Sequence, residues 1–221
     1  MVCCTLHSRT LAKDMNIETD IMFGIPVGHT TLPLELCDIL KNLKGQEQKK
    51  TTDDPKHYDV LVNHQYVKND LTNLFSIWVN NTYGNKDQKW KMVTNWITDN
   101  SDGSAMGRHR HYNCMFSAVL YFDTVADGQG NLILESPLQQ SDFFFDRRNQ
   151  PSTMFSAREY RCPLFEGLIL FFPSNLYHSY PKYKPSDKYM VRRSFACNFA
   201  PIGKLGFVDS SLDTNLLQHD G

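Results

Sequence analysis

Residues 115–123, MFSAVLYFD, begin a series of short extended segments that decides the fold of this chain. Aromatic and β-branched residues of this kind favour strands. Clusters of Gly, Pro, Asn and Asp, which are typical of turns, separate one segment from the next. Short strands joined by turns predict antiparallel β structure that closes into a sandwich or barrel. The later segments are 131–135 (NLILE), 167–173 (GLILFFP), 176–180 (LYHSY) and 189–199 (YMVRRSFACNF).

Before residue 88 the pattern predicts an opening strand over residues 18–29 and then two helices. The first helix would follow Thr31, an expected N-cap, and Pro33, because apolar residues then recur at helical spacing. The second covers residues 69–80. The fold class predicted from these patterns is α+β and mostly β, with supporting helices near the N-terminus. The helical apolar residues are Leu36, Ile39, Leu40 and Leu43, then Leu71, Leu74, Phe75 and Trp78.

The composition fits one compact domain of an ordinary globular protein. The chain has 221 residues, a net charge of −1 and 41% hydrophobic residues. We expect a disordered N-terminal segment at residues 1–15, a single domain at 16–204 with its β core at about 88–200, and a C-terminal tail at 205–221.

Charge and hydropathy exclude several classes of partner. The near-zero net charge gives no signal for binding to nucleic acid or to an acidic membrane surface. No apolar run approaches the roughly 20 residues that cross a bilayer. The first residues lack the apolar core of a signal peptide. We therefore predict a cytoplasmic protein.

Three histidines carry the strongest chemical signal. His109 and His111 are two residues apart, so a strand would place both on one face, together with Asn113. His178 follows the apolar segment 167–173 and could complete the set. Three protein ligands with open positions are typical of a catalytic metal rather than a structural one. The alternative is that His178 only caps the end of a strand.

Arg192 and Ser194 form a second pair with the same spacing. They share a strand face with Ala196 and Asn198, and small polar residues on one face suit the wall of a polar cavity. An arginine together with a hydroxyl matches a carboxylate. The alternative is that the arginines are solvated on an edge strand.

These residues together resemble the iron(II)/2-oxoglutarate-dependent oxygenase superfamily, in particular a bacterial and viral group related to prolyl hydroxylases. The resemblance covers about half of the chain well and most of it loosely. The order in which the motifs occur along the chain is more specific than any single motif. The matching pieces are Phe23–Pro26, Trp96, His109-Arg-His111, Ser117–Tyr121, the Gly128/Gly130 turn, Gly167–Ser174 with His178, and Arg192-Arg-Ser194 ending at Asn198.

The resemblance implies a double-stranded β-helix, or jelly-roll, with iron at its mouth. It implies iron ligands at His109 and His178, and Arg192 and Ser194 holding the distal carboxylate of 2-oxoglutarate. Tyr121 matches a tyrosine that bonds the same carboxylate. The implied enzyme is a dioxygenase, in particular a hydroxylase, that uses iron(II), 2-oxoglutarate and dioxygen. Its oxidation of an unknown substrate, a protein side chain or a small molecule, would be coupled to decarboxylation of 2-oxoglutarate to succinate.

One position departs from the superfamily pattern of two histidines and a carboxylate. His111 occupies the carboxylate position, and we keep it as a metal ligand. The alternative is that Asp123 or Glu135 reaches the metal. Two other classes remain open: a three-histidine cupin-type metalloenzyme that does not use 2-oxoglutarate, and a non-catalytic barrel that binds a metal or another ligand.

Overall fold

The computed structural model describes residues 18–22, 24–43, 59–100, 103–124, 131–137, 157–182 and 192–215. The expected disordered segment 1–15 lies outside these ranges, as do Phe23 and the Gly128/Gly130 turn. The predicted domain boundaries and the cytoplasmic location stay predictions.

Antiparallel sheets make up most of the regular secondary structure, so the predicted class, mostly β with a few helices, is confirmed. The largest sheet has six strands in the order β1-β2-β8-β5-β10-β3. Its strands are β1 (Glu18–Met22), β2 (Ile25–Thr31), β3 (Lys89–Asp99), β5 (Phe116–Thr124), β8 (Leu168–Pro173) and β10 (Arg192–Ile202).

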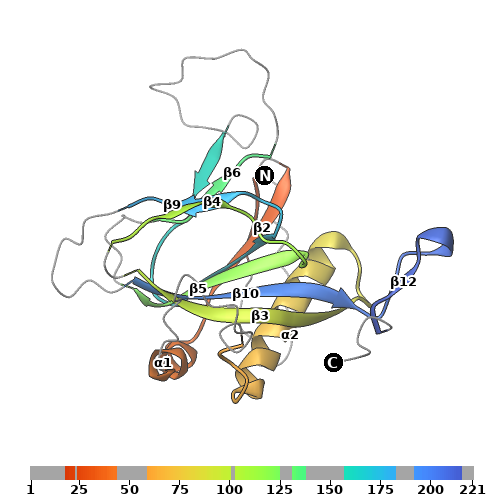
Figure 1. Ribbon diagram of the computed structural model, residues 1–221, viewed down its shortest axis with the longest axis horizontal. Helices are drawn as coiled ribbons and strands as arrows, with labels where there is room; N and C mark the ends of the chain where they lie inside the picture. The colour runs from red at the N-terminus through yellow and green to blue at the C-terminus, as the bar shows by residue number, and fades with distance from the viewer. Residues whose placement is uncertain are drawn as a thin grey trace, which may run out of the picture.

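A smaller sheet of four strands lies opposite the large one in Figure 1, in the order β4-β9-β6-β7. It consists of β4 (Met106–His109), β6 (Ile133–Glu135), β7 (Glu159–Arg161) and β9 (His178–Tyr180). Beyond β10, a two-stranded sheet contains β11 (Lys204–Leu205) and β12 (Leu212–Asp213), with a 3-10 turn at Val208–Ser210 between them.

Two helices, α1 (Leu34–Asn42) and α2 (Gln65–Tyr83), pack against the face of the large sheet that points away from the small sheet. Phe75 of α2 lies at the centre of this core, where its ring stacks on that of Phe199 with centroids 4.0 Å apart and planes 7° apart. Trp78 passes so close to β2 that a side chain at Gly28 would overlap its indole. The apolar face of α2 therefore fixes one side of the large sheet.

A second apolar cluster lies between the two sheets. It contains Leu132 and Leu134 from the small-sheet side, with Leu170 and Phe172 of β8 facing them. Successive side chains of β5 point to opposite faces of the large sheet. Tyr121 therefore belongs to this inner cluster, and Phe122 belongs to the core on the helix side. The large sheet thus separates the core beneath the helices from the apolar cluster between the two sheets.

One local expectation, the helix N-cap, was wrong. Thr31 is the last residue of β2 rather than a helix N-cap, and Pro33 occupies the cap position of α1 without a side-chain hydrogen bond. In β3 the pairing with β10 shifts by one residue around Val93, so Met92 faces the helices while Thr94 faces the small sheet.

Neither described helix has the length and apolar character that a bilayer crossing requires.

Candidate metal centre

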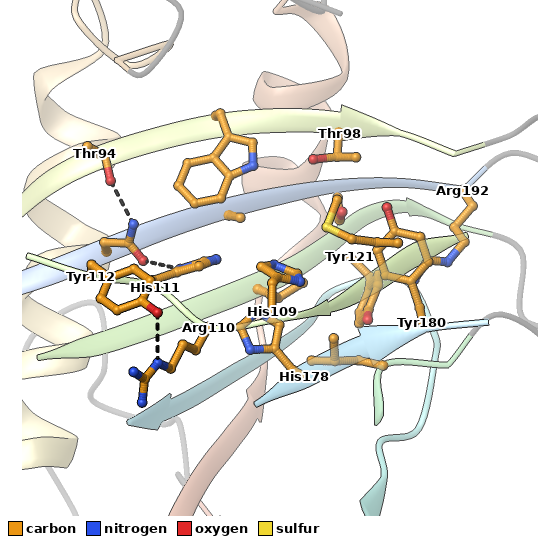
Figure 2. A pocket seen from close by; sticks show the side chains of 17 residues that line it. Thr94, Thr98, His109, Arg110, His111, Tyr112, Tyr121, His178, Tyr180 and Arg192 are labelled. Carbon is orange, nitrogen blue, oxygen red and sulfur yellow. Dashed lines mark hydrogen bonds between the residues drawn. The ribbon is translucent and has the colours of Figure 1, made fainter. Parts of the chain in front are cut away.

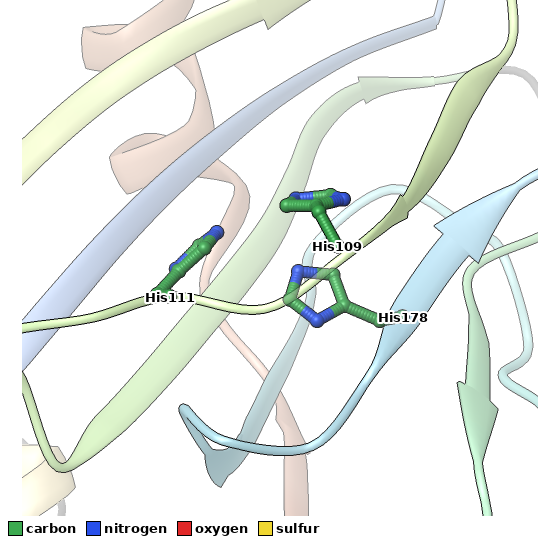
Figure 3. Close-up of side chains that lie close together, drawn as sticks. All are labelled: His109, His111 and His178. Carbon is green, nitrogen blue, oxygen red and sulfur yellow. The ribbon is translucent and has the colours of Figure 1, made fainter.

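His109 at the end of β4, His111 just after it and His178 at the start of β9 come together (Figure 3). One ring nitrogen from each histidine lies within 4.8 Å of the other two. The ring centroids of His109 and His178 are 4.2 Å apart, and that of His111 is 5.0 Å from His178. Pairing of β4 with β9 places His109 directly opposite His178. No other group of histidine, cysteine or acidic side chains converges in this way within the described ranges.

Each histidine has its Nδ1 atom within hydrogen-bond distance of an acceptor oxygen. Nδ1 of His109 lies 2.9 Å from the Gly107 carbonyl, and Nδ1 of His178 lies 2.9 Å from the Leu176 carbonyl. A carbonyl can only accept, so both Nδ1 atoms donate, and in the neutral form of each ring the lone pair lies on Nε2. This tautomer is the one that binds a metal through Nε2.

His111 lies just beyond the end of β4 and is oriented by β10. Its Nδ1 lies 2.7 Å from Oδ1 of Asn198 and 3.0 Å from Oγ of Ser117. Asn198 in turn donates from Nδ2 to Oγ1 of Thr94 at 2.8 Å, which fixes its Oδ1 as the atom that faces His111. The Nε2 of His111 is therefore left for a ligand as well.

Burial keeps two of these imidazoles neutral. Burial lowers the pKa of His178 to about 3; the Leu176 carbonyl opposes this shift, and His109 and His111 add to it. Burial also lowers the pKa of His111, although the hydrogen bond to Asn198 opposes it. A neutral imidazole can bind a metal ion without first losing a proton.

The histidines line a cavity of about 500 Å³ between the two sheets. Its floor is the inner face of β3, β5 and β10, and Figure 2 draws the side chains that line it. No Asp or Glu lines the cavity within the described part of the chain. The cavity residues of these strands are Thr94, Trp96, Thr98, Val119, Tyr121, Arg192, Ser194, Ala196 and Asn198.

Arg192, Ser194 and Tyr121 lie together at one end of this cavity. Arg192 is 2% exposed, and its guanidinium lies 4.2 Å from the Tyr180 ring centroid and 5.6 Å from that of Tyr121. It also donates to Oδ1 of Asn100 at 3.3 Å. β10 pairs Ser194 with Tyr121, which brings the predicted residues side by side.

The Tyr121 hydroxyl is buried and has no hydrogen-bond partner among the described residues. Burial raises its pKa far above that of a phenol in water, and the nearby Arg192 only partly offsets this. The phenol therefore keeps its proton and can donate it to a bound acceptor. A buried hydroxyl without a partner is costly unless a ligand completes it.

Neither of the two carboxylates considered as metal ligands belongs to the histidine group. Asp123 pairs with Arg193 at 3.2 Å, and Glu135 pairs with Arg108 at 2.7 Å. Among the described residues, the group that could hold a metal ion therefore consists of histidines alone.

Sequence reasoning placed Asn113 beside the histidines, and this was wrong. β4 ends at His109, and Asn113 is exposed with a φ of 57°, so it does not continue the strand face. Asn198, rather than Asn113, lies beside His111. Its position on the same face as Arg192 was the available signal, but its bond to His111 spans 87 residues of sequence.

Residues 94–198 match the model of a protein family described as "Putative 2OG-Fe(II) oxygenase". This segment belongs to that oxygenase family. The predicted relationship is confirmed, and so are the enzyme class and the cofactors: the oxygenase is an oxidoreductase that uses iron(II), 2-oxoglutarate and dioxygen.

Solved structures to which the chain is similar include a prolyl-4-hydroxylase from Pseudomonas putida. It is 14% identical to the oxygenase, with 79% of this chain and 84% of that chain covered and a TM-score of 0.45. HygX from Streptomyces hygroscopicus, solved with nickel and 2-oxoglutarate bound, is 11% identical, with 78% and 82% covered and a TM-score of 0.49. No curated protein matches the chain.

Proposed function

We propose that this oxygenase is a hydroxylase whose iron(II) is held by His109, His111 and His178. The observation that carries the proposal is the convergence of three imidazoles whose Nδ1 atoms already have acceptors. Nitrogens bound to one ion at about 2.1 Å can be at most about 4 Å apart, so small side-chain movements from 4.8 Å close the site. Three protein ligands leave positions open for a cosubstrate.

The cosubstrate 2-oxoglutarate would extend from the metal toward Arg192, Ser194 and Tyr121. Three neutral histidines leave the charge of the ion uncompensated, and no acidic side chain among the described residues lines the cavity. A dianion fits this environment. The Tyr121 hydroxyl and the Arg192 guanidinium would donate to its distal carboxylate, and Ser194 would add a third donor.

When bound, iron(II) with 2-oxoglutarate supplies the activation of dioxygen, coupled to decarboxylation of 2-oxoglutarate to succinate. The chain orients the three histidine rings and excludes water from the metal site. Asn198 and the Gly107 and Leu176 carbonyls hold the three rings in one tautomer. Trp96, whose ring lies 5.5 Å from that of His111, shields the metal side of the cavity.

The fold that we propose is a double-stranded β-helix. Its support is the way the chain alternates between the two sheets from β4 to β10. The small sheet contains β4, β6, β7 and β9, and the large sheet contains β5, β8 and β10. Alternation between two facing antiparallel sheets is the pattern of a jelly-roll.

A second candidate function is favoured by the all-histidine donor set. Three histidines also suit zinc, or a cupin-type metalloenzyme without 2-oxoglutarate. In that case Arg192 and Tyr121 would hold no oxoacid.

An anaerobic titration distinguishes the two. Iron(II) and then 2-oxoglutarate are added to metal-free protein, and the visible charge-transfer band of the chelated oxoacid is recorded. We expect the band in wild type and its loss in His111→Ala. Tight metal binding without a band would overturn the 2-oxoglutarate assignment and favour the second candidate. A band of wild-type strength in His111→Ala would remove only His111 from the ligand set.

A further inference from the structure

We propose that the substrate carries an anionic group, a carboxylate or a phosphate, and that Arg110 binds it with Tyr112 at its side. The proposal rests on the proposed function, because it assigns the Arg192 end of the cavity to 2-oxoglutarate. Arg110 lies between two of the proposed metal ligands in sequence, and both Arg110 and Tyr112 line the cavity.

The two arginines of the cavity lie at opposite ends of it. Arg192 begins β10, and Asn198, which contacts His111, lies six residues along that strand, a distance of about 20 Å in an extended chain. In Figure 2 Arg192, Tyr121 and Tyr180 lie on one side of the histidines, and Arg110 and Tyr112 lie on the other. A cosubstrate that reaches from the metal to Arg192 therefore leaves Arg110 for another molecule.

Arg110 is held in place by aromatic groups rather than by a carboxylate. Its Nε donates to the Tyr112 hydroxyl at 3.2 Å, and its guanidinium lies 5.0 Å from the Tyr112 ring centroid and 5.3 Å from that of Tyr177. Within the described ranges Arg110 makes no ion pair. Arg108, two residues earlier, instead pairs with Glu135 at 2.7 Å and does not line the cavity. Arg110 is thus pre-positioned, with its charge open to a ligand.

The charges of the loaded site favour an anion at this position. A divalent metal and the dianion of 2-oxoglutarate cancel, and the three histidines are neutral ligands. Arg110 and Arg192 then leave the cavity positive, since none of its described lining residues is acidic. A positive cavity with apolar walls attracts an anionic substrate and disfavours a cationic one.

The test uses three probes with the same ring and different head groups: benzoate, phenylphosphonate and benzamide. Protein is loaded with zinc(II), which has no redox chemistry, and saturated with 2-oxoglutarate. Saturation-transfer NMR gives the Kd of each probe for wild type and variants. The variants are Arg110→Ala, Arg110→Lys, Tyr112→Phe and the matched control Arg108→Ala, which removes an equal charge two residues away.

We expect at least one anionic probe to bind about tenfold to a hundredfold more tightly than benzamide, as a charge-assisted hydrogen bond implies. Arg110→Ala should reduce it to the benzamide level, Arg110→Lys should retain part of the preference, and Arg108→Ala should retain all of it. Whether benzoate or phenylphosphonate binds more tightly distinguishes a carboxylate from a phosphate substrate.

Equal binding of all three probes, or anion binding unchanged in Arg110→Ala, would overturn the proposal. Displacement of 2-oxoglutarate by the anionic probe, seen in its own NMR signals, would also overturn it, because the probe would then occupy the Arg192 end. If 2-oxoglutarate itself fails to bind while anion binding still depends on Arg110, the proposed function fails and the anion site stands.

Discussion

The two faces of β10 have opposite chemistry although their residues alternate along one strand. Phe195, Cys197 and Phe199 point toward the helices and are fully buried in the apolar core. Arg192 and Asn198 point between the sheets and are almost as inaccessible, at 2% and 8% exposure, yet they are polar. Burial alone therefore does not separate core from site in this protein.

The difference lies in what each face contacts. The helix side is filled by rings, such as Phe75 stacked on Phe199, and gains stability from apolar contact. The cavity side orders polar groups by hydrogen bonds, such as the chain from Thr94 through Asn198 to His111. We expect substitutions on the helix side to reduce stability, and those on the cavity side to reduce binding.

The largest effect is expected on the cavity side, for His178→Ala. Loss of one of the three proposed metal ligands should reduce iron(II) stoichiometry and bring metal-dependent succinate formation to background. Thermal unfolding should change less than in a core variant, because water can fill the space left by the ring. Wild-type succinate formation in this variant would contradict the proposed site.

Phe199→Ala tests the opposite face. Removing a buried ring that stacks on Phe75 should lower the free energy of unfolding by about 3–5 kcal/mol. Urea unfolding measures the change, and Phe199→Leu should lose less. The iron(II) affinity of the folded fraction should match wild type, and a large loss of affinity would show that the two faces are not independent.

Arg192→Ala should weaken 2-oxoglutarate binding about tenfold to a hundredfold, as loss of a charge-assisted bond implies. The matched control is Arg193→Ala, since this neighbour faces away and pairs with Asp123. The charge-transfer band, titrated with 2-oxoglutarate under anaerobic conditions, gives both values. Equal affinities in the two variants would remove the cosubstrate role of Arg192.

Asn198→Ala should weaken iron(II) binding about tenfold to a hundredfold, because His111 would lose the group that orients it. Asn198→Asp keeps an acceptor at Oδ1 and should recover part of the affinity. Competition with a chelator measures it. If both variants bind iron(II) as wild type does, the position of His111 does not depend on β10.

The smallest effect is expected for Asp59, the partner of Asn95, which is a polar side chain of β3 on the helix side. Asn95 is fully buried and donates to Oδ1 of Asp59 at 2.7 Å, and Asp59 also pairs with Lys68. Burial raises the pKa of Asp59, but the bonds from Lys68 and Asn95 outweigh it and leave the pKa lowered. A lowered pKa means that this stabilisation is present above pH 4 or so and is lost as the pH falls through the folded-state value.

Asp59→Asn should therefore reduce stability by no more than about 1 kcal/mol at pH 7 and by less near pH 3. Urea unfolding of both proteins at the two pH values measures the difference. A difference that grows toward low pH would contradict the sign of the shift.

Much of this molecule follows from local pattern. The five extended segments all contain strands, because alternation of side chains is a property of a few consecutive residues. The same local rule grouped Arg192 with Ser194, and the spacing of His109 and His111 indicated a shared site. Even the helices were found from spacing alone, although α2 extends beyond the predicted 69–80 at both ends.

Pairing between distant segments decided the rest. The register shifts at Val93 and near Phe122 depend on how β10 pairs with its neighbours, so an ideal alternation misplaces Met92 and Asp123. The ion pairs that occupy Asp123 and Glu135 exist only through space, and so does the bond from Asn198 to His111. The sequence by itself determined which side chains are the candidates for the chemistry, because residue type and short spacing are local. Only the tertiary structure decided which groups orient them, because those contacts join segments that the chain keeps far apart.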